Sequence, residues 1–115
     1  MHTARDLELA AALPAWIRLG TSSWTFVGWE NLFYEPPVTL KALNHGGLRA
    51  YGENKLFSAV GIDRSYYGPI PQKELDAYAE ALPDRFTALS KIWADVTTYA
   101  FPDHPSAGER AGKRN

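Results

Sequence analysis

The chain has 115 residues, enough for one domain and too few for two. It is 45% hydrophobic and 22% charged with a net charge of -1, which excludes a globally basic surface for nucleic acid or an anionic membrane. The absence of cysteine excludes disulfide bonds and thiol chemistry, and no apolar run approaches the ~18 residues of a membrane span. We therefore expect a cytoplasmic protein that binds neither nucleic acid nor a membrane.

The first 15 residues are predicted to form a helical extension of the main domain. Residues 6–13 combine apolar and acidic side chains, Asp6 is suited to the N-cap, and Pro14 ends the helix. Residues 16–20 are a short apolar run that ends in glycine, which predicts a first strand. A polar and aromatic loop follows at residues 21–24.

The middle of the chain predicts two helical connections and a second strand. Residues 25–37 are rich in aromatic residues and proline and predict a long ordered loop, and residues 38–56 are predicted to include helix. Residues 57–62 are apolar and small, as in a crowded parallel strand. Between Pro71 and Pro83, apolar residues recur at helical spacing, which predicts a helix.

A third strand is predicted at residues 86–92, and beyond it the composition changes. Residues 102–115 hold proline, glycine and charged residues with little apolar content, which predicts a flexible tail. The main domain is therefore expected to span residues 16–101. The order strand, helix, strand, helix, strand predicts an α/β fold with about three parallel strands and connecting helices.

Each predicted strand ends in residues that are capable of chemistry. In parallel α/β folds, ligands bind at the carboxyl ends of the strands, where these groups would share one rim. We expect a pocket there for a small polar or anionic molecule, with Asp63 and Lys91 as the candidates for a catalytic role. The choice between an enzyme and a binding protein stays open. The candidate ligand-binding residues are Ser22, Ser23, Trp24, Trp29, Asp63, Arg64, Tyr66, Tyr67, Lys91 and Trp93.

Several of these residues also have a structural interpretation. Lys91 lies in an apolar strand, which predicts a part-buried ammonium that either serves the ligand site or forms an interior ion pair with Asp63. Trp24 and Trp29 fit either the core or the wall of a cleft. The three histidines lie away from the strand ends and show no metal-ligand spacing, so we predict no metal site and no cofactor.

Three blocks of the chain resemble a known family, called domain of unknown function 72 or the YecE-like proteins. The first block is Gly-Thr-Ser-Ser-Trp at residues 20–24, followed by Gly-Trp at 28–29 and Phe-Tyr at 33–34. The second is residues 57–63, which end in an aspartate, followed by a Tyr-Tyr pair. The third is residues 86–91, which end in a lysine. The resemblance spans about residues 16–114.

The resemblance implies a fold like a TIM barrel, and a function that is not established for the family. Likeness to endonuclease IV and xylose isomerase barrels implies nucleic-acid or sugar-phosphate chemistry only by analogy of fold. A closed barrel takes about 250 residues, so we interpret the chain as a partial barrel, a fragment of about three strands. Alternatives are a non-catalytic fragment that associates with itself or with a complementing barrel fragment, and a split-gene product without independent function.

Overall fold

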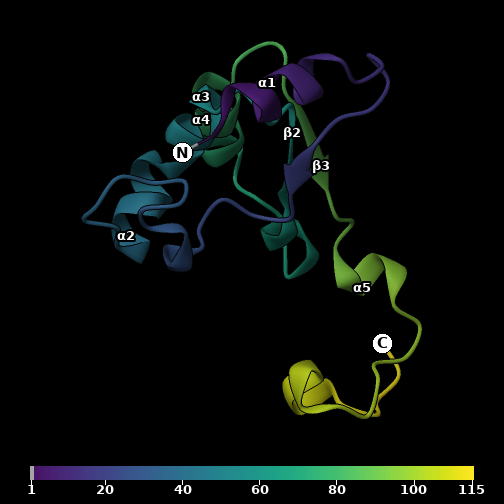
Figure 1. The fold of residues 1–115 in the computed structure, drawn as a ribbon. Coiled ribbons are helices and arrows are strands. Elements are labelled where there is room, and N and C mark those ends of the chain that lie inside the picture. The colour runs from purple at the N-terminus through teal and green to yellow at the C-terminus, as the bar shows by residue number, and fades with distance from the viewer. Residues whose placement is uncertain (1) are drawn as a thin grey trace.

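A computed structural model describes residues 2–115 and places three strands in one open sheet flanked by helices (Figure 1). The strands are β1 (Gly20–Thr21), β2 (Ala59–Ile62) and β3 (Thr87–Ser90), and they lie in the order β1-β2-β3. Both pairings are parallel, with Thr21 opposite Val60 and Ile62 opposite Ser90. The predicted α/β fold with three parallel strands is confirmed.

The first strand lies further along the chain than predicted. Residues 16–20 were expected to form it, but only Gly20 pairs, and Trp16 is 81% exposed. The stretch before it bends instead, because the amide of Ile17 donates to the carbonyl of Pro14 at 2.8 Å. Apolar character alone could not place the strand, since no element packs over Trp16 to bury it.

Two helical connections link the strands. The first runs from α2 (Leu40–Ala42) through a π-helical turn (Leu43–Gly47) into α3 (Leu48–Glu53). The second is α4 (Gln72–Ala81), which lies between Pro71 and Pro83 as predicted. The aromatic loop before α2 contains a 3-10 turn at Val27–Trp29.

The N-terminal helix α1 (Ala4–Ala11) begins earlier than predicted. Its N-cap is Thr3, not Asp6, and the two residues form a capping box in which Thr3 donates to the Asp6 carboxylate and accepts from the Asp6 amide. The hydrogen bond from the Thr3 side chain, reinforced by its backbone amide, lowers the pKa of Asp6. Asp6 therefore stabilises the helix from its first turn rather than from the cap.

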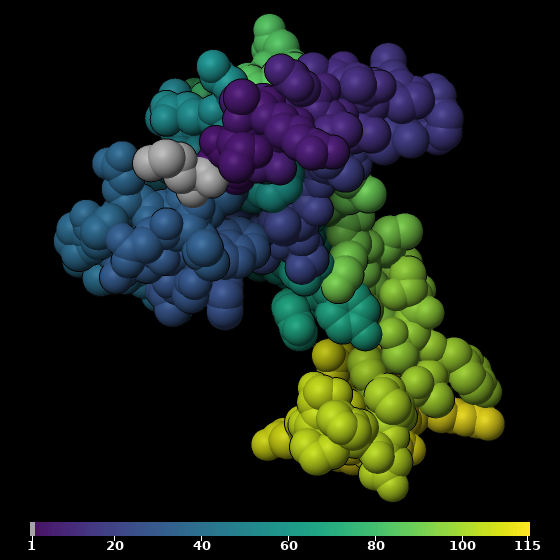
Figure 2. Space-filling view, viewed as in Figure 1, coloured from purple at the N-terminus to yellow at the C-terminus, as the bar shows by residue number. Residues whose placement is uncertain are grey.

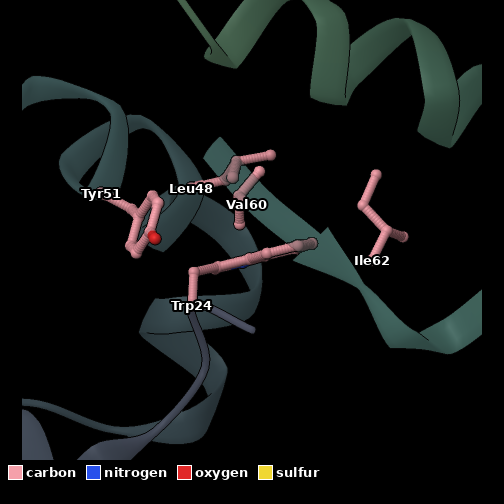
Figure 3. Close-up of a cluster of buried hydrophobic side chains, with 5 residues drawn as sticks. All are labelled: Trp24, Leu48, Tyr51, Val60 and Ile62. Atoms are coloured by element: carbon pink, nitrogen blue, oxygen red, sulfur yellow. The ribbon is translucent and has the colours of Figure 1, made fainter. Parts of the chain in front are cut away.

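The core lies between the helices and β2. Its centre is a cluster of Trp24, Leu48, Tyr51, Val60 and Ile62, which Figure 3 shows gathered around β2. Tyr51 is fully buried, and its hydroxyl donates to the carbonyl of Ala59 and accepts from the amide of Thr21. One side chain from α3 thereby links β1 to β2.

The strands approach each other closely where β1 ends. A Cβ added to Gly61 would lie 2.7 Å from the carbonyl oxygen of Ser22, so only glycine fits there without a shift of the backbone. This agrees with the crowding that the small residues of β2 predict.

The far side of the sheet and the C-terminal region are open. All four residues of β3 are exposed, and after α5 (Ala94–Thr97) the chain leads to a separate lobe, yellow in Figure 2. The radius of gyration is 16.7 Å, against about 13 Å for a compact domain of this length. The accessible area is 8458 Å², against about 6300 Å² for a compact protein of this mass.

Residues 102–115, expected to form a flexible tail, fold back on the chain before them. A 3-10 segment (Pro105–Arg110) reverses the chain, and the amide of Phe101 donates to the carbonyl of Lys113 at 2.9 Å. The Asn115 side chain donates to the carbonyls of Asp95 and Thr98. The flexibility of this segment in solution stays a prediction.

Candidate functional site at the carboxyl ends of the strands

The three strands end in a serine, an aspartate and a lysine. Ser22 directly follows β1, Asp63 follows β2 and Lys91 follows β3. Because the strands are parallel and in register, their carboxyl ends meet at one edge of the sheet. Lys91 Nζ lies 3.0 Å from Asp63 Oδ1. The ion pair that the sequence offered as one alternative is therefore present.

This ion pair is more exposed than expected. The side chains of Lys91 and Asp63 are 58% and 41% exposed, so the predicted part-burial of Lys91 is wrong. The physical reason is that β3 forms an edge of the sheet and no strand of the described chain pairs with its outer side. Lys91 therefore keeps two ammonium donors and access to solvent while one donor serves Asp63.

A pocket of about 440 Å³, here called the rim pocket, contains this pair together with Ser22 and Ser90. The Ser90 hydroxyl donates to Ser65 at 2.8 Å, which holds the end of β3 against the turn after β2. The Lys91 ammonium also lies 5.9 Å from the ring centre of Tyr66. The rim pocket therefore offers a positive donor and hydroxyl groups to a polar ligand.

The other predicted residues after β2 have different positions. Arg64 forms an ion pair with Glu74 of α4 rather than with Asp63. Tyr67 is 75% exposed and lies edge-on to Tyr66. Asp63 and Arg64, although adjacent in sequence, thus have different partners of opposite charge, Lys91 and Glu74.

The predicted tryptophans do not converge on one pocket. Trp24 is buried in the core, and Tyr34 donates to its backbone carbonyl at 2.7 Å. Burial, together with the nearby Tyr51, raises the pKa of Tyr34 to about 12. Trp29 packs among Phe26, Phe33 and Tyr34. Trp93 lies at the N-cap of α5, beyond the rim.

A second pocket, of about 640 Å³, lies on the helix side of the same rim, and we call it the helix-side pocket. Asp63 borders both pockets. Ser23, Trp24 and Arg64 were predicted as site residues and line it, whereas Asn44, Glu74 and Tyr78 were not. The order of elements could have indicated Glu74. The helix that follows a parallel strand begins near the carboxyl end of that strand, so its first turn lies close to the rim.

Neither a metal cluster nor a membrane span is found in residues 2–115. No three histidine or carboxylate side chains of this part of the chain are placed to hold a metal ion. Within the same range, no helix has the length and apolar character needed to cross a bilayer.

The chain matches one family. The family described as "Protein of unknown function DUF72" matches residues 18–110, which confirms the resemblance read from the three sequence blocks. No curated protein and no solved structure matches the chain.

Proposed function

The chain belongs to the DUF72 family of proteins of unknown function, and we propose that it binds a small polar or anionic molecule in the rim pocket. The observation that carries this proposal is the Asp63–Lys91 ion pair at 3.0 Å, inside a pocket that Ser22 also lines. Three residues that are distant in sequence, each the first after its strand, meet at the edge where parallel α/β proteins bind ligands.

The chemistry of these residues favours an anionic group. The Lys91 ammonium has three donors and a compact charge, and the Ser22 hydroxyl adds a neutral donor. Asp63 holds Lys91 in place and partly neutralises it, and Arg18 adds a second cation to the lining of the pocket, so a small anion or polar molecule is favoured. Asp63 and Lys91 are also the groups best placed to exchange a proton with a ligand.

The arrangement of the strands supports a fold like a partial TIM barrel. Three adjacent parallel strands joined by helical connections are the repeating pattern of a (β/α)8 barrel. Under this proposal the rim pocket is part of the ligand-binding face of such a barrel.

Titration with inorganic phosphate and with glycolate tests the rim pocket, by isothermal calorimetry or by amide chemical shifts. We expect Lys91→Ala to weaken binding about tenfold, equivalent to about 1.4 kcal/mol. Asp63→Asn removes the competing carboxylate and should strengthen binding of phosphate. Lys73→Ala, at an exposed position of α4, removes the same charge elsewhere and is the matched control. If Lys91→Ala leaves both dissociation constants unchanged, the rim pocket is not the binding site.

A second candidate function is association with another chain. An apolar strip along the open side of the molecule favours it: Leu89, Ile92, Val96 and Tyr99 are between 60% and 72% exposed. Within residues 2–115, β3 also pairs only with β2, so its outer edge has free backbone groups. A second copy or a chain carrying further β/α units would cover both, and the chain would then act only in association.

Light scattering separates the two candidates. Association predicts a mass above that of one chain, lowered by Ile92→Glu in the apolar strip. Leu9→Glu changes an equally exposed residue of α1 and should leave the mass unchanged. A monomer at all concentrations, with cooperative unfolding, would exclude association.

A further inference from the structure

Arg18 is a cation in the lining of the rim pocket, and its charge has no carboxylate partner within residues 2–115. Its Nη1 atom donates to the backbone carbonyl of Arg85 at 2.7 Å, just before β3 begins. Because β2 lies between β1 and β3, the guanidinium reaches across the amino end of β2. The hydrogen bond fixes its position there and leaves its remaining N–H donors for another group.

Lys91 lies at the opposite end of the same pocket. The parallel register puts Gly20 level with Thr87, through Ala59 of β2. Arg18 precedes this level by two residues and Lys91 follows it by four. Their Cα atoms are therefore about 20 Å apart along the strands, at about 3.3 Å per residue. Since both side chains line the pocket, it runs along the sheet between them and is elongated.

Between its two ends, the rim pocket has a lining of small and apolar residues. Gly20, Ala59 and Gly61 form a floor without long side chains, and Leu89, which is 60% exposed, lies beside it. β2 has a strand on each side, so the sheet uses its backbone donors and acceptors. A ligand that lies over this floor is therefore stabilised by a hydrocarbon segment rather than by further polar groups.

The two ends of the pocket differ in charge. Arg18 is not neutralised, and a guanidinium binds a carboxylate through two parallel hydrogen bonds. Lys91 and Asp63 neutralise each other and together offer a donor and an acceptor, and the Ser22 hydroxyl lines the same pocket. This end suits a neutral hydroxyl group, which can donate and accept at once.

We propose that the rim pocket binds an elongated hydroxy acid, whose carboxylate lies on Arg18 and whose hydroxyl lies between Lys91 and Asp63. Its hydrocarbon chain lies over Gly61 and beside Leu89. The inference rests on the proposed function and names the class of ligand for that pocket. The volume of about 440 Å³ lies within the usual range of ligand pockets, which is about 300–1,000 Å³.

Calorimetric titration of the full chain with ω-hydroxydecanoate tests this inference. Decanoate has the carboxylate without the hydroxyl, and the decanediol with two terminal hydroxyls lacks the carboxylate. We expect ω-hydroxydecanoate to bind about tenfold more tightly than either, because only it hydrogen-bonds to charged groups at both ends. The shorter ω-hydroxybutanoate cannot reach both ends and should show no such advantage over butanoate.

Variants of Arg18 give the second measurement. Arg18→Gln should remove the advantage of ω-hydroxydecanoate over the diol, whereas Arg18→Lys keeps the charge and should retain part of it. Arg5→Gln, at an exposed position of α1, removes the same charge elsewhere and should change nothing.

The inference is overturned if ω-hydroxydecanoate binds no more tightly than decanoate, or if Arg18→Gln leaves its dissociation constant unchanged. Phosphate binding that still depends on Lys91 would then show that the proposed function holds and that only the ligand class is wrong. Phosphate binding that does not depend on Lys91 would overturn the proposed function, and this inference with it.

Discussion

β2 and β3 are neighbouring strands of equal length in one sheet, and their environments are opposite. Ala59, Val60 and Ile62 of β2 are buried, whereas every residue of β3 is exposed. β2 reads Ala-Val-Gly-Ile and β3 reads Thr-Ala-Leu-Ser, and a phenylalanine one or two residues before each strand packs against the core. The difference comes from the neighbours: β2 has a strand on each side and the core residues of α3 and α4 against it, whereas β3 has one strand.

The largest effect should come from removing the core residue that supports β2. Tyr51 is fully buried and stacks with Phe57 at a centroid distance of 5.1 Å. Tyr51→Ala should lower the free energy of unfolding by about 3–5 kcal/mol, because a large aromatic side chain leaves a cavity. Leu89→Ala on β3 should change it by about 0.5 kcal/mol or less. Urea unfolding measures both, and equal losses would show that β3 is buried in solution.

The hydroxyl group of Tyr51 should account for the next largest effect. It bonds to the amide of Thr21 and to the carbonyl of Ala59, so Tyr51→Phe leaves two backbone groups between β1 and β2 without this partner. We expect a loss of about 1–3 kcal/mol in unfolding free energy. Tyr67→Phe removes a hydroxyl from a side chain that is 75% exposed and is the control. Equal stability of the two variants would contradict the bridging role of Tyr51.

Alkaline pH should lower the free energy of unfolding, because it deprotonates the buried Tyr34. Burial raises the pKa of Tyr34 to about 12, above the ordinary value of about 10. The folded state therefore favours the protonated phenol, and the stabilisation it gives is fully present below pH 10 and is lost as the pH rises toward 12. Unfolding free energies measured across this range should fall more steeply for the native chain than for Tyr34→Phe. Parallel slopes would show that Tyr34 titrates normally.

The sequence predicts which residues lie at the strand ends better than it predicts which side chains are buried. Asp63 and Lys91 could be assigned to strand ends because the alternation of apolar runs and helical spacing sets where strands stop, within one or two residues. The exposure of Lys91 could not be predicted, because it depends on whether another element covers β3. The displaced first strand has the same cause, since Trp16 is apolar but has no partner to pack against.

The helix-side pocket was only partly predictable for a related reason. Arg64 and Trp24 were assigned from their place after a strand, but Asn44 belongs to a connection whose glycines obscure its helical pattern. Glu74 lies in the first turn of α4, and the apolar spacing that predicts this helix carries no signal that Glu74 borders a pocket. A pocket built from two consecutive connections becomes visible only when their packing is known.

The smallest effect on stability should come from the Asp63–Lys91 pair. This pair joins the end of β2 to the end of β3, so its coupling energy reports how exposed the β3 side is. Both side chains are more than a third exposed, so solvent screens their attraction. A double-mutant cycle with Asp63→Asn and Lys91→Met should give a coupling energy of about 1 kcal/mol or less.

The Arg110–Asp95 pair of the C-terminal region has similar exposure and provides a reference for this cycle. Equal coupling in the two pairs means that the rim at β3 is open to solvent, as the structure shows. A partner that covers β3 would remove water from the rim and raise the coupling of Asp63 and Lys91 alone, because charges interact more strongly where the dielectric constant is low. The same cycle measured across protein concentration therefore distinguishes a rim that awaits a ligand from one that awaits a second chain.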